Sequence, residues 1–381
     1  MKLVLTGGGT GGHFYPLIAV VEAIEDICKE RRLIEPQYFY VGPDPFDSRA
    51  LAEHDIEYVK SPAGKLSRDS RIPNPIHMLK AWSGIVKSFF MLFSLYPDII
   101  FSTGGYAAFP TLAAARLLRI PVIIYDADAT PGRVSLWASS FAQWIAVAHP
   151  DAASAFPEKT RKKIARTGHP IRVEIEHPSS EGGHEFLKLD PNAPTILVLG
   201  GSQGSQTINN VLVDALPTLL NTYNVVHQTG PLNLKDSAGL ANVVLKDHPH
   251  AERYRAYGLL NTLALKMSAG ISSLVIARAG SGTIFEISSW GIPSILVPLP
   301  EDISHDQTEN AYSYARAGAA LVVEQKNLSQ HLLLAEIERL MTDEMTKKRM
   351  SEAALSFARP GAGRKIAEVI LETGISHEPA V

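Results

Sequence analysis

A short apolar segment that runs into a glycine-rich turn and then into a helical pattern occurs twice in this chain. The first copy is residues 2–6, followed by glycines at 7–9, and the second is residues 195–199, followed by the turn 200–204. After each start, further apolar segments of three to five residues alternate with helical patterns. Such alternation predicts parallel sheets that are covered by helices on both faces. The expected strands are 2–6, 37–41, 98–101, 121–125 and 143–147, then 195–199, 223–227, 242–245, 273–277, 294–297 and 320–323.

The two starts predict two Rossmann-like α/β domains, which agrees with a length of 381 residues. We expect an N-terminal domain over 1–176 and a C-terminal domain over 195–356, joined by a polar linker at 177–194 that is rich in glycine and proline. The last segment, 357–381, is expected to form a helix that packs back on the N-terminal domain. Ligands bind beyond the carboxyl ends of the strands in open α/β sheets, so one cleft between the two domains is expected.

Composition excludes several classes of protein. The 36 basic and 39 acidic residues give a net charge of −3, which is not the positive footprint of a protein that binds bulk nucleic acid. Cys28 is the single cysteine, so an internal disulfide and a cysteine-based zinc site are excluded, and a reducing compartment is expected. The longest apolar run, 84–96, contains Lys87 and is shorter than the roughly 20 residues that a membrane-spanning helix needs.

The first glycine turn, TGGGTGGH, matches G-x-G-x-x-G through Gly7, Gly9 and Gly12. A nicotinamide-dinucleotide site requires an acidic residue at the end of the second strand, but the nearest acid there is Asp44, beyond a Gly-Pro pair. The pattern therefore indicates a general anion site, because a glycine turn at a helix start presents backbone N–H groups; the alternative is a tight turn without a ligand. His13 at this helix start can be a general base, a phosphate ligand or a capping group.

Two more glycine turns follow strands in the second half. Residues 200–205 (GGSQGS) form a second anion cradle, to which Ser202 adds a hydroxyl group, and residues 278–283 (RAGSGT) form a third. Glu286 follows the third turn, where its carboxylate either complements the helix dipole or accepts both hydroxyls of a ribose. Three glycine turns with this acid favour a nucleoside diphosphate over a bare phosphate.

Two other segments match weaker patterns. Asp126 and Asp128 have the D-x-D spacing by which some nucleotide-sugar enzymes hold a divalent metal, but that arrangement belongs to a single-domain architecture, so no metal is expected here. Residues 305–310 (HDQTEN) are either an ordinary helix start or a set of side chains suited to sugar hydroxyls.

Seven motifs in order then define a resemblance that covers about residues 1–372. They are TGGGTGGHFYP (6–16), FSTGGYAAFP (101–110), TGHPIR (167–172), LVLGGSQGSQTIN (197–209), HQTGP (227–231), ARAGSGTIFE (277–286) and the ILVPLP…HDQTENA run (295–311). Together they resemble the bacterial UDP-N-acetylglucosamine–N-acetylmuramyl-(pentapeptide) pyrophosphoryl-undecaprenol N-acetylglucosaminyltransferase family. The resemblance implies a GT-B fold and inverting transfer of GlcNAc from UDP-GlcNAc to the C4 hydroxyl of the MurNAc of lipid I, which gives lipid II for peptidoglycan, with no cofactor required.

The resemblance also implies site residues by motif position. The implied UDP-GlcNAc-binding residues are Thr10, Gly11, Gly12, Asp128, Arg172, Ser202, Ser281, Gly282, Thr283, Glu286, Asp306 and Gln307. Within this set, the first glycine turn is implied to face a donor or acceptor diphosphate, and the third to face the donor phosphates. Glu286 is implied to bind the ribose, and Gln307 with Asp306 the GlcNAc hydroxyls.

One departure from the family concerns the acceptor side. The family usually reads His-Glu-Gln-Asn where this chain has Tyr125-Asp126-Ala127-Asp128, so that Asp128 stands at the position of the asparagine. A carboxylate near a diphosphate is repelled unless it is protonated or turned to a hydroxyl. Either the acceptor contact has changed or Asp128 acts as a base, so the candidate catalytic bases are His13 and Asp128.

The apolar segment 75–96 has two interpretations. It consists mainly of aromatic and aliphatic residues, with Lys80 and Lys87 interspersed. It forms either buried core helices or an interfacial patch that docks on a membrane. In the family the N-terminal domain binds the membrane that carries the lipid-linked acceptor. The resemblance therefore implies a peripheral protein at the cytoplasmic face of the cell membrane.

Two alternative functions remain open from the sequence. One is another UDP-sugar enzyme of the GT-B fold, such as a UDP-GlcNAc 2-epimerase, which needs neither a lipid acceptor nor a membrane patch. The other is a nucleotide-sugar-binding regulatory protein without turnover, for which the altered segment 125–128 is the only support.

Overall fold

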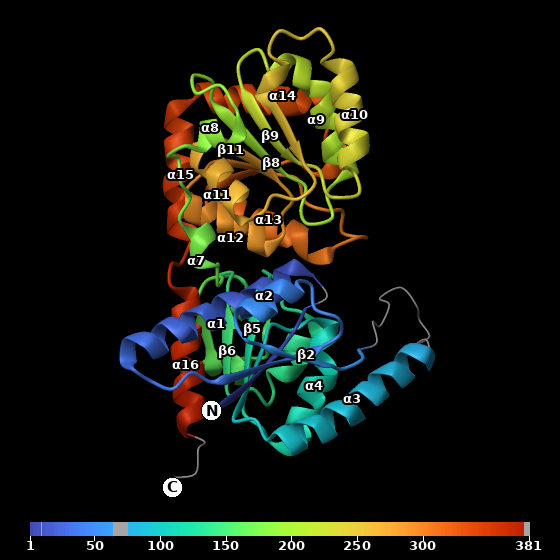
Figure 1. Cartoon of the computed structure of the whole chain (residues 1–381), viewed down its shortest axis with the longest axis vertical. Coiled ribbons are helices and arrows are strands. Elements are labelled where there is room, and N and C mark those ends of the chain that lie inside the picture. Colours follow the sequence, from blue (N-terminus) through green and yellow to red (C-terminus); the bar gives the residue numbers. More distant parts are fainter. Residues whose placement is uncertain (9, 64–74, 377–381) are drawn as a thin grey trace. The chain divides into compact units, whose positions relative to one another are not determined.

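The computed structural model describes residues 1–8, 10–63 and 75–376 (Figure 1). The chain forms two compact units: unit 1 consists of Met1–Arg172 and Pro360–Val381, and unit 2 consists of Val173–Arg359. Each unit is built on one fully parallel sheet. The fold class is therefore α/β with two Rossmann-like domains, as the sequence predicted.

The sheet of unit 1 has seven strands in the order β3-β2-β1-β4-β5-β6-β7. Their bounds are β1 (Lys2–Thr6), β2 (Gln37–Gly42), β3 (Glu57–Lys60), β4 (Ile99–Ser102), β5 (Val122–Asp126), β6 (Trp144–Val147) and β7 (Ile164–Arg166). The central strand β1 pairs Val4 with Phe39 on one side and with Ile100 on the other. Because helices cover both faces, Leu3, Val4 and Leu5 in succession are fully buried.

The helices of unit 1 are α1 (Gly11–Arg31), α2 (Ser48–Glu53), α3 (Pro75–Leu95), α4 (Gly105–Leu118), α5 (Arg133–Ala138), α6 (Ala152–Ala155) and α16 (Ala362–Ser376), with a 3-10 turn at Glu158–Lys163. Helix α16 packs against α1, and both lie on the first unit in Figure 1. Gly363 allows this close approach, since a Cβ there would lie 3.1 Å from the carbonyl oxygen of Ala19. Helix α3 packs along α4.

The sheet of unit 2 has six strands in the order β10-β9-β8-β11-β12-β13. Their bounds are β8 (Thr195–Leu199), β9 (Asn224–Gln228), β10 (Tyr254–Tyr257), β11 (Ser272–Ala277), β12 (Ser294–Leu296) and β13 (Ala320–Val322). The helices are α7 (Val173–Glu176), α8 (Gly183–Leu187), α9 (Gln206–Leu219), α10 (Leu234–Val244), α11 (Thr262–Ile271), α12 (Ser281–Trp290), α13 (His305–Arg316), α14 (Gln330–Thr342) and α15 (Glu344–Phe357), with 3-10 turns at Ala251–Arg253 and Gln325–Asn327.

The predicted strand at 242–245 is wrong, because these residues lie at the end of α10 and just beyond it. Three short strands were not predicted: β3, β7 and β10. Each of the three is the last strand at an edge of its sheet, and each is at least partly exposed, so it lacks the continuous apolar run of a central strand.

The segment 177–194, which composition predicted as a linker, belongs to unit 2 and contains α8. Helix α8 packs against α11, and Leu187 and Leu189 are buried. Arg255 donates hydrogen bonds to the carbonyls of Leu187 and Lys188, at 3.0 and 2.5 Å. This segment is therefore held on the surface of unit 2 by its own contacts.

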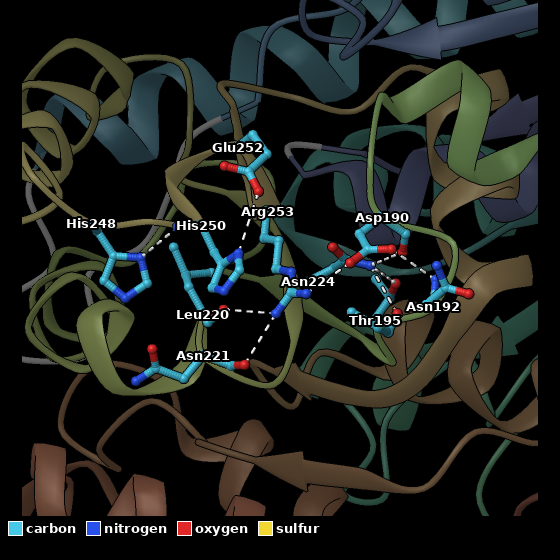
Figure 2. Close-up of polar contacts among 11 residues, drawn as sticks. Asp190, Asn192, Thr195, Leu220, Asn221, Asn224, His248, His250, Glu252 and Arg253 are labelled. Atoms are coloured by element: carbon cyan, nitrogen blue, oxygen red, sulfur yellow. Dashed lines mark hydrogen bonds and ion pairs between the residues drawn. The ribbon is translucent and has the colours of Figure 1, made fainter.

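A polar network holds the same segment at the amino ends of β8 and β9 (Figure 2). Arg253 forms an ion pair with Asp190 at 2.7 Å and donates to the carbonyls of Leu220 and Asn221, both at 3.1 Å. The amide of Asn224 donates to the carbonyl of Asp190 at 2.8 Å. The network lies at the edge of the sheet opposite to the carboxyl ends of the strands, and we interpret it as structural.

Candidate functional site

Each sheet has one topological switch point. There, the chain leaves two neighbouring strands toward opposite edges of the sheet. In unit 1 it lies between β1 and β4, and in unit 2 between β8 and β11. Two glycine-rich segments follow the strands at each switch point. In unit 1 they are residues 7–8 with 10–12, and residues 103–105; in unit 2 they are residues 200–205 and 278–283. Open α/β sheets bind ligands at this position, so each unit presents a candidate site at its switch point.

In unit 1 the turn after β1 is packed too tightly for side chains. A Cβ on Gly7 would lie 2.0 Å from the hydroxyl oxygen of Thr103, and a Cβ on Gly8 would lie 2.5 Å from that of Tyr40. The buried hydroxyl of Tyr40 donates to the carbonyl of Gly7 at 2.8 Å. The glycines therefore let the backbone approach β2 and the turn after β4.

The implied diphosphate residues lie at the start of α1. Thr10 is the N-cap residue, and its carbonyl accepts the N–H groups of His13 and Phe14, both at 3.2 Å. The N–H groups of Gly11 and Gly12 come earlier in the helix and have no acceptor within it. Thr10 and Gly12 are exposed, so this helix start has the geometry of an anion site.

His13 is held by the turn that follows β4. Its Nδ1 lies 2.9 Å from the carbonyl oxygen of Thr103, and the hydroxyl of Thr103 donates to the carbonyl of His13 at 2.6 Å. A carbonyl only accepts, so Nδ1 carries the proton and the neutral ring has its lone pair on Nε2. This nitrogen lies beside Gly105, 3.6 Å from the place where a Cβ would be. The arrangement suits a general base.

Asp126 and Asp128 have different surroundings. The Asp126 carboxylate is buried and accepts the N–H groups of Asp128 and Gly132, at 3.2 and 3.1 Å, and burial raises its pKa to about 6. Asp128 is only half-buried. Over the part of the chain that the structure describes, no group of three or more His, Cys, Asp and Glu residues is arranged to hold a metal ion. Through its hydrogen bonds to the N–H groups of Asp128 and Gly132, the Asp126 carboxylate anchors this loop.

Arg172 closes the set of site residues in unit 1. Its guanidinium stacks on the ring of Tyr15, with 4.2 Å between Cζ and the ring centroid. The hydroxyl of Tyr15 donates to Asp47, the N-cap residue of α2, at 3.3 Å. Arg172 is half-buried, and its guanidinium lies over the face of the Tyr15 ring in a cation–π contact.

In unit 2 the turn after β8 presents Ser202 to solvent. Gly201 and Gly204 have φ angles of 85° and 78°, and a Cβ on Gly204 would lie 1.9 Å from the carbonyl oxygen of Thr229. Ser205 is the N-cap residue of α9, where its hydroxyl accepts the N–H of Ile208 at 3.3 Å. The result is a fixed turn at the start of a 14-residue helix.

Helix α12 begins directly after the other turn of this switch point. Gly280 is its N-cap residue, Ser281 is buried, and Gly282 and Thr283 are half-buried in the first turn. Glu286 is also half-buried and follows Thr283 by three positions, which puts both on one face of the helix. An anion at the helix start and a hydroxyl-bearing group one turn along would both be within reach of this face.

Arg278 links the turns of unit 2 and was not predicted as a site residue. It is 7% exposed. Its guanidinium donates to the carbonyls of Val297 and Pro298, at 3.0 and 3.2 Å, and to the side-chain oxygens of Ser205 and Gln325, both at 2.6 Å. It therefore joins the chain that follows β8, β12 and β13 to the end of β11. The sequence signal was its place at the head of the RAGSGT turn.

Gln307 lies in the first turn of α13. Its Oε1 accepts the N–H of Leu299 at 3.1 Å, so its amide group offers N–H donors on the other side. Asp306, the preceding residue, is half-buried. Because Arg278 holds the two carbonyls that precede Leu299, the orientation of Gln307 depends on Arg278 as well.

The implied site residues thus fall into two groups. Unit 1 contains Thr10, Gly11, Gly12, His13, Asp128 and Arg172, and unit 2 contains Ser202, Ser281, Gly282, Thr283, Glu286, Asp306 and Gln307. Thr103, the partner of His13, was missed, although it lies in the quoted FSTGGYAAFP motif. Gln228 was also missed: its amide donates to the carbonyl of Gly201 at 3.2 Å and accepts the N–H of Leu260 at 3.0 Å.

Two family models match the chain. Residues 3–147 match the glycosyltransferase family 28 N-terminal domain, and residues 195–365 match the glycosyltransferase family 28 C-terminal domain. A relative from Treponema denticola, the UDP-N-acetylglucosamine–N-acetylmuramyl-(pentapeptide) pyrophosphoryl-undecaprenol N-acetylglucosamine transferase, is 33% identical over 97% of this chain and 96% of its own length.

Solved structures show the same fold. The crystal structure of Acinetobacter baumannii MurG superposes with a TM-score of 0.74 at 24% identity, and covers 97% of this chain and 99% of its own. A putative UDP-N-acetylglucosamine 2-epimerase from Listeria monocytogenes superposes with a TM-score of 0.69 at 14% identity, over 99% of this chain and 97% of its own. At these identities both likenesses establish the GT-B fold alone.

Proposed function

The chain belongs to the family of UDP-N-acetylglucosamine–N-acetylmuramyl-(pentapeptide) pyrophosphoryl-undecaprenol N-acetylglucosamine transferases, and from this premise we propose that it transfers GlcNAc from UDP-GlcNAc to lipid I. The product is lipid II, a precursor of peptidoglycan. The observation that carries the proposal is the 33% identity over 97% of the chain, together with the glycine turns at both switch points.

Unit 2 is proposed to hold the donor. The N–H groups at the start of α12, with the side chains of Ser281 and Thr283, are suited to the diphosphate, and the Glu286 carboxylate to the two ribose hydroxyls. The amide of Gln307, with its oxygen engaged by Leu299, presents N–H donors for sugar hydroxyls. Ser202 and the turn around it complete the proposed donor site.

Unit 1 is proposed to hold the acceptor, with its diphosphate at the start of α1. The C4 hydroxyl of the muramyl sugar attacks the anomeric carbon from the face opposite to UDP, so the configuration inverts. His13 is the proposed base, because the carbonyl of Thr103 fixes the proton on Nδ1 and leaves Nε2 to accept one. Negative charge that develops on the leaving UDP is stabilised by the backbone N–H groups at the start of α12.

The assay for this function measures UDP release and lipid-linked product from UDP-GlcNAc and lipid I. We expect UDP release only when lipid I is present. The rival activity, 2-epimerisation, would convert UDP-GlcNAc to its manno-epimer without any acceptor, and that result would reject the transferase. Absence of both products, with UDP-GlcNAc still bound, would favour a binding protein without turnover.

Replacement of His13 tests the proposed base. We expect His13→Ala to lower kcat by about 10²- to 10⁴-fold, the usual contribution of a general base, while the Kd for UDP-GlcNAc changes little. The matched control is His331→Ala, since His331 is an exposed histidine on α14. An unchanged kcat in His13→Ala would remove His13 from the role of base.

Helix α3 is proposed to dock unit 1 on a membrane that carries the acceptor. Among the described side chains, its exposed apolar residues recur at helical spacing: Trp82 (64% exposed), Val86 (48%), Phe90 (66%) and Phe93 (66%), with Tyr96 (82%) just past its end. The opposite face contains buried Leu92 and packs on α4. The side chains at 75–81, including Lys80, lie outside the described residues.

This amphipathic arrangement supports an interfacial helix, with one face on the core and one apolar face outward. Exposed Lys87 adds a basic group next to the apolar face. No helix among the residues that the structure describes is long and apolar enough to span a bilayer. We therefore propose peripheral binding to the cytoplasmic leaflet through the apolar face of α3.

Vesicle co-sedimentation tests this docking. Burial of one phenylalanine side chain contributes about 1.5–3 kcal/mol, so Phe90→Glu is expected to weaken binding to vesicles that contain phosphatidylglycerol by about 10- to 100-fold. Val243→Glu is the control, because Val243 is a 73% exposed apolar residue on α10 of unit 2. Equal effects of the two variants, or no effect of Phe90→Glu, would reject the proposed docking face.

A further inference from the structure

A tyrosine and a histidine form a buried pair at the carboxyl ends of β5 and β7. The Tyr125 hydroxyl lies 2.6 Å from Nδ1 of His169, and the two rings meet edge to face with centroids 5.8 Å apart. Tyr125 is fully buried and His169 is 7% exposed. Burial, followed by the nearby carboxylates of Asp126 and Asp128, raises the pKa of Tyr125, so the phenol remains protonated and donates to His169.

This hydrogen bond determines which nitrogen of His169 carries the proton. A phenol hydroxyl can donate or accept, but the buried Tyr125 hydroxyl has no other hydrogen-bond partner among the described residues, so its proton is directed to Nδ1 of His169. The neutral ring therefore carries its hydrogen on Nε2. Burial lowers the pKa of His169 to about 3, and the neighbouring His149 and His13 act in the same direction, whereas Asp128 acts in the opposite one. Burial likewise lowers the pKa of His149 to about 4.

His13 and His169 therefore have opposite tautomers. His13 has its proton on Nδ1, where the Thr103 carbonyl accepts it, and presents an acceptor at Nε2. His169 has its acceptor at Nδ1, occupied by the Tyr125 hydroxyl, and presents a donor at Nε2. The difference arises because the carbonyl of Thr103 can only accept, whereas the buried hydroxyl of Tyr125 has only His169 among the described residues to receive its proton. Asp128 is within electrostatic range of the His169 ring.

We propose that Tyr125 is a positioning residue of the acceptor site, which holds His169 as a neutral ring protonated at Nε2. His169 then supplies a hydrogen-bond donor within electrostatic range of Asp128, and it cannot compete with His13 as a base. This inference rests on the proposed function for its assignment to the acceptor. Tyr125 stands where the family usually has histidine, so the pair accompanies the change of that motif in this chain.

The tautomer is tested by NMR of the whole protein with ¹⁵N-labelled histidine, in which the His169 signals are assigned by their loss in His169→Gln. We expect a protonated-type shift for Nε2, an unprotonated-type shift for Nδ1, and no titration between pH 8 and pH 5. Protonation at Nδ1, or titration near pH 6.5, would overturn the proposal. This test needs no substrate, so it stands even if the chain does not act on lipid I.

The variant Tyr125→Phe removes the hydroxyl and keeps the ring. We expect the Nε2–H preference of His169 to be lost and kcat/KM for lipid I to fall on the order of tenfold, while the KM for UDP-GlcNAc stays unchanged. Tyr38→Phe is the matched control, because Tyr38 is a buried tyrosine on β2 whose hydroxyl has no hydrogen-bond partner among the described residues.

The outcomes separate the possible failures. A wild-type tautomer in Tyr125→Phe would show that Tyr125 does not set it, and equal loss of activity in both tyrosine variants would reduce its role to packing. Failure of the wild-type protein to transfer GlcNAc would reject the proposed function and leave the NMR result as the test of the pair.

Discussion

Replacement of Arg278 by lysine tests whether the turns of the proposed donor site depend on one buried guanidinium. Arg278 makes four hydrogen bonds to acceptors on three segments: two carbonyls after β12, the hydroxyl of Ser205 and the amide oxygen of Gln325. A lysine keeps the charge, but its ammonium group is a single compact donor and lacks the two separate nitrogens of the guanidinium. It cannot reach both the pair of carbonyls bound by Nη1 and the pair of side-chain oxygens bound by Nη2. We expect Arg278→Lys to lose two of the four hydrogen bonds.

The size of the effect follows from these bonds. A hydrogen bond that involves a charged group contributes about 1.5–3 kcal/mol, so the loss of two gives at least about 3 kcal/mol. That is a large part of the roughly 5–15 kcal/mol of a whole domain and corresponds to a fall of about 1–3 M in the urea midpoint. Burial lowers the pKa of Arg278 to about 10, so the side chain is still charged at neutral pH and deprotonation plays no part.

The assay compares unfolding in urea with UDP-GlcNAc binding by calorimetry, on the folded protein. For Arg278→Lys we expect a lower urea midpoint and a Kd for UDP-GlcNAc at least about tenfold higher. The reason is that Arg278 fixes both Ser205 and the carbonyls of Val297 and Pro298, which precede the Leu299 contact of Gln307. The control is Arg253→Lys, which disturbs the half-buried network at the opposite edge of the same sheet (Figure 2). It is expected to lower the midpoint and leave the Kd unchanged.

Two results would refute this reasoning. A wild-type midpoint in Arg278→Lys would mean that lysine satisfies the same acceptors. A wild-type Kd in a destabilised Arg278→Lys, matching Arg253→Lys, would mean that Arg278 serves only the fold of unit 2.

Three further predictions concern stability. Burial lowers the pKa of His227 to about 3, so below pH 6.5 the unfolded chain binds this proton more readily than the folded chain does. His227 alone should therefore lower the unfolding free energy by about 2 kcal/mol from pH 6.5 to pH 5, and urea titrations of His227→Gln should show a flatter pH dependence. In Gly204→Ala the new Cβ clashes with the Thr229 carbonyl at a residue with positive φ, so the variant should have a lower melting temperature and no UDP-GlcNAc binding. In the control Gly239→Ala a Cβ has free space, and neither property should change. Tyr40→Phe leaves the Gly7 carbonyl without its buried donor and should cost about 1–3 kcal/mol in urea unfolding; an unchanged midpoint would show that another donor replaces the hydroxyl.

The sequence predicted the fold class because the central strands have a strong local signal. β1 and β8 are continuous apolar runs that end in glycine turns, as expected for parallel strands buried on both faces. The edge strands β3, β7 and β10 are partly exposed and were missed. The segment 242–245 was predicted as a strand because a short apolar run looks alike in the sequence of a strand and of a buried helix. In the structure these residues lie at the end of α10 and just beyond it.

The candidate site was predicted in part for a similar reason. Glycine turns and motif residues such as Ser202 and Glu286 are visible in the sequence because backbone geometry and a motif demand particular residue types. Contacts over long sequence distances are not visible: Thr103 lies 90 residues from His13, and Gln325 lies 47 residues from Arg278.

The sequence by itself determined that this chain has two parallel α/β domains, each with glycine turns at the carboxyl ends of its first strand, because these features depend on local apolar runs and on residues that tolerate close backbone approach. Only the tertiary structure decided the protonation pattern of the site. The Thr103 carbonyl makes His13 an acceptor at Nε2, and the Tyr125 hydroxyl makes His169 a donor there. Both results depend on which distant polar group the fold brings next to each imidazole ring, and no local sequence pattern encodes that contact.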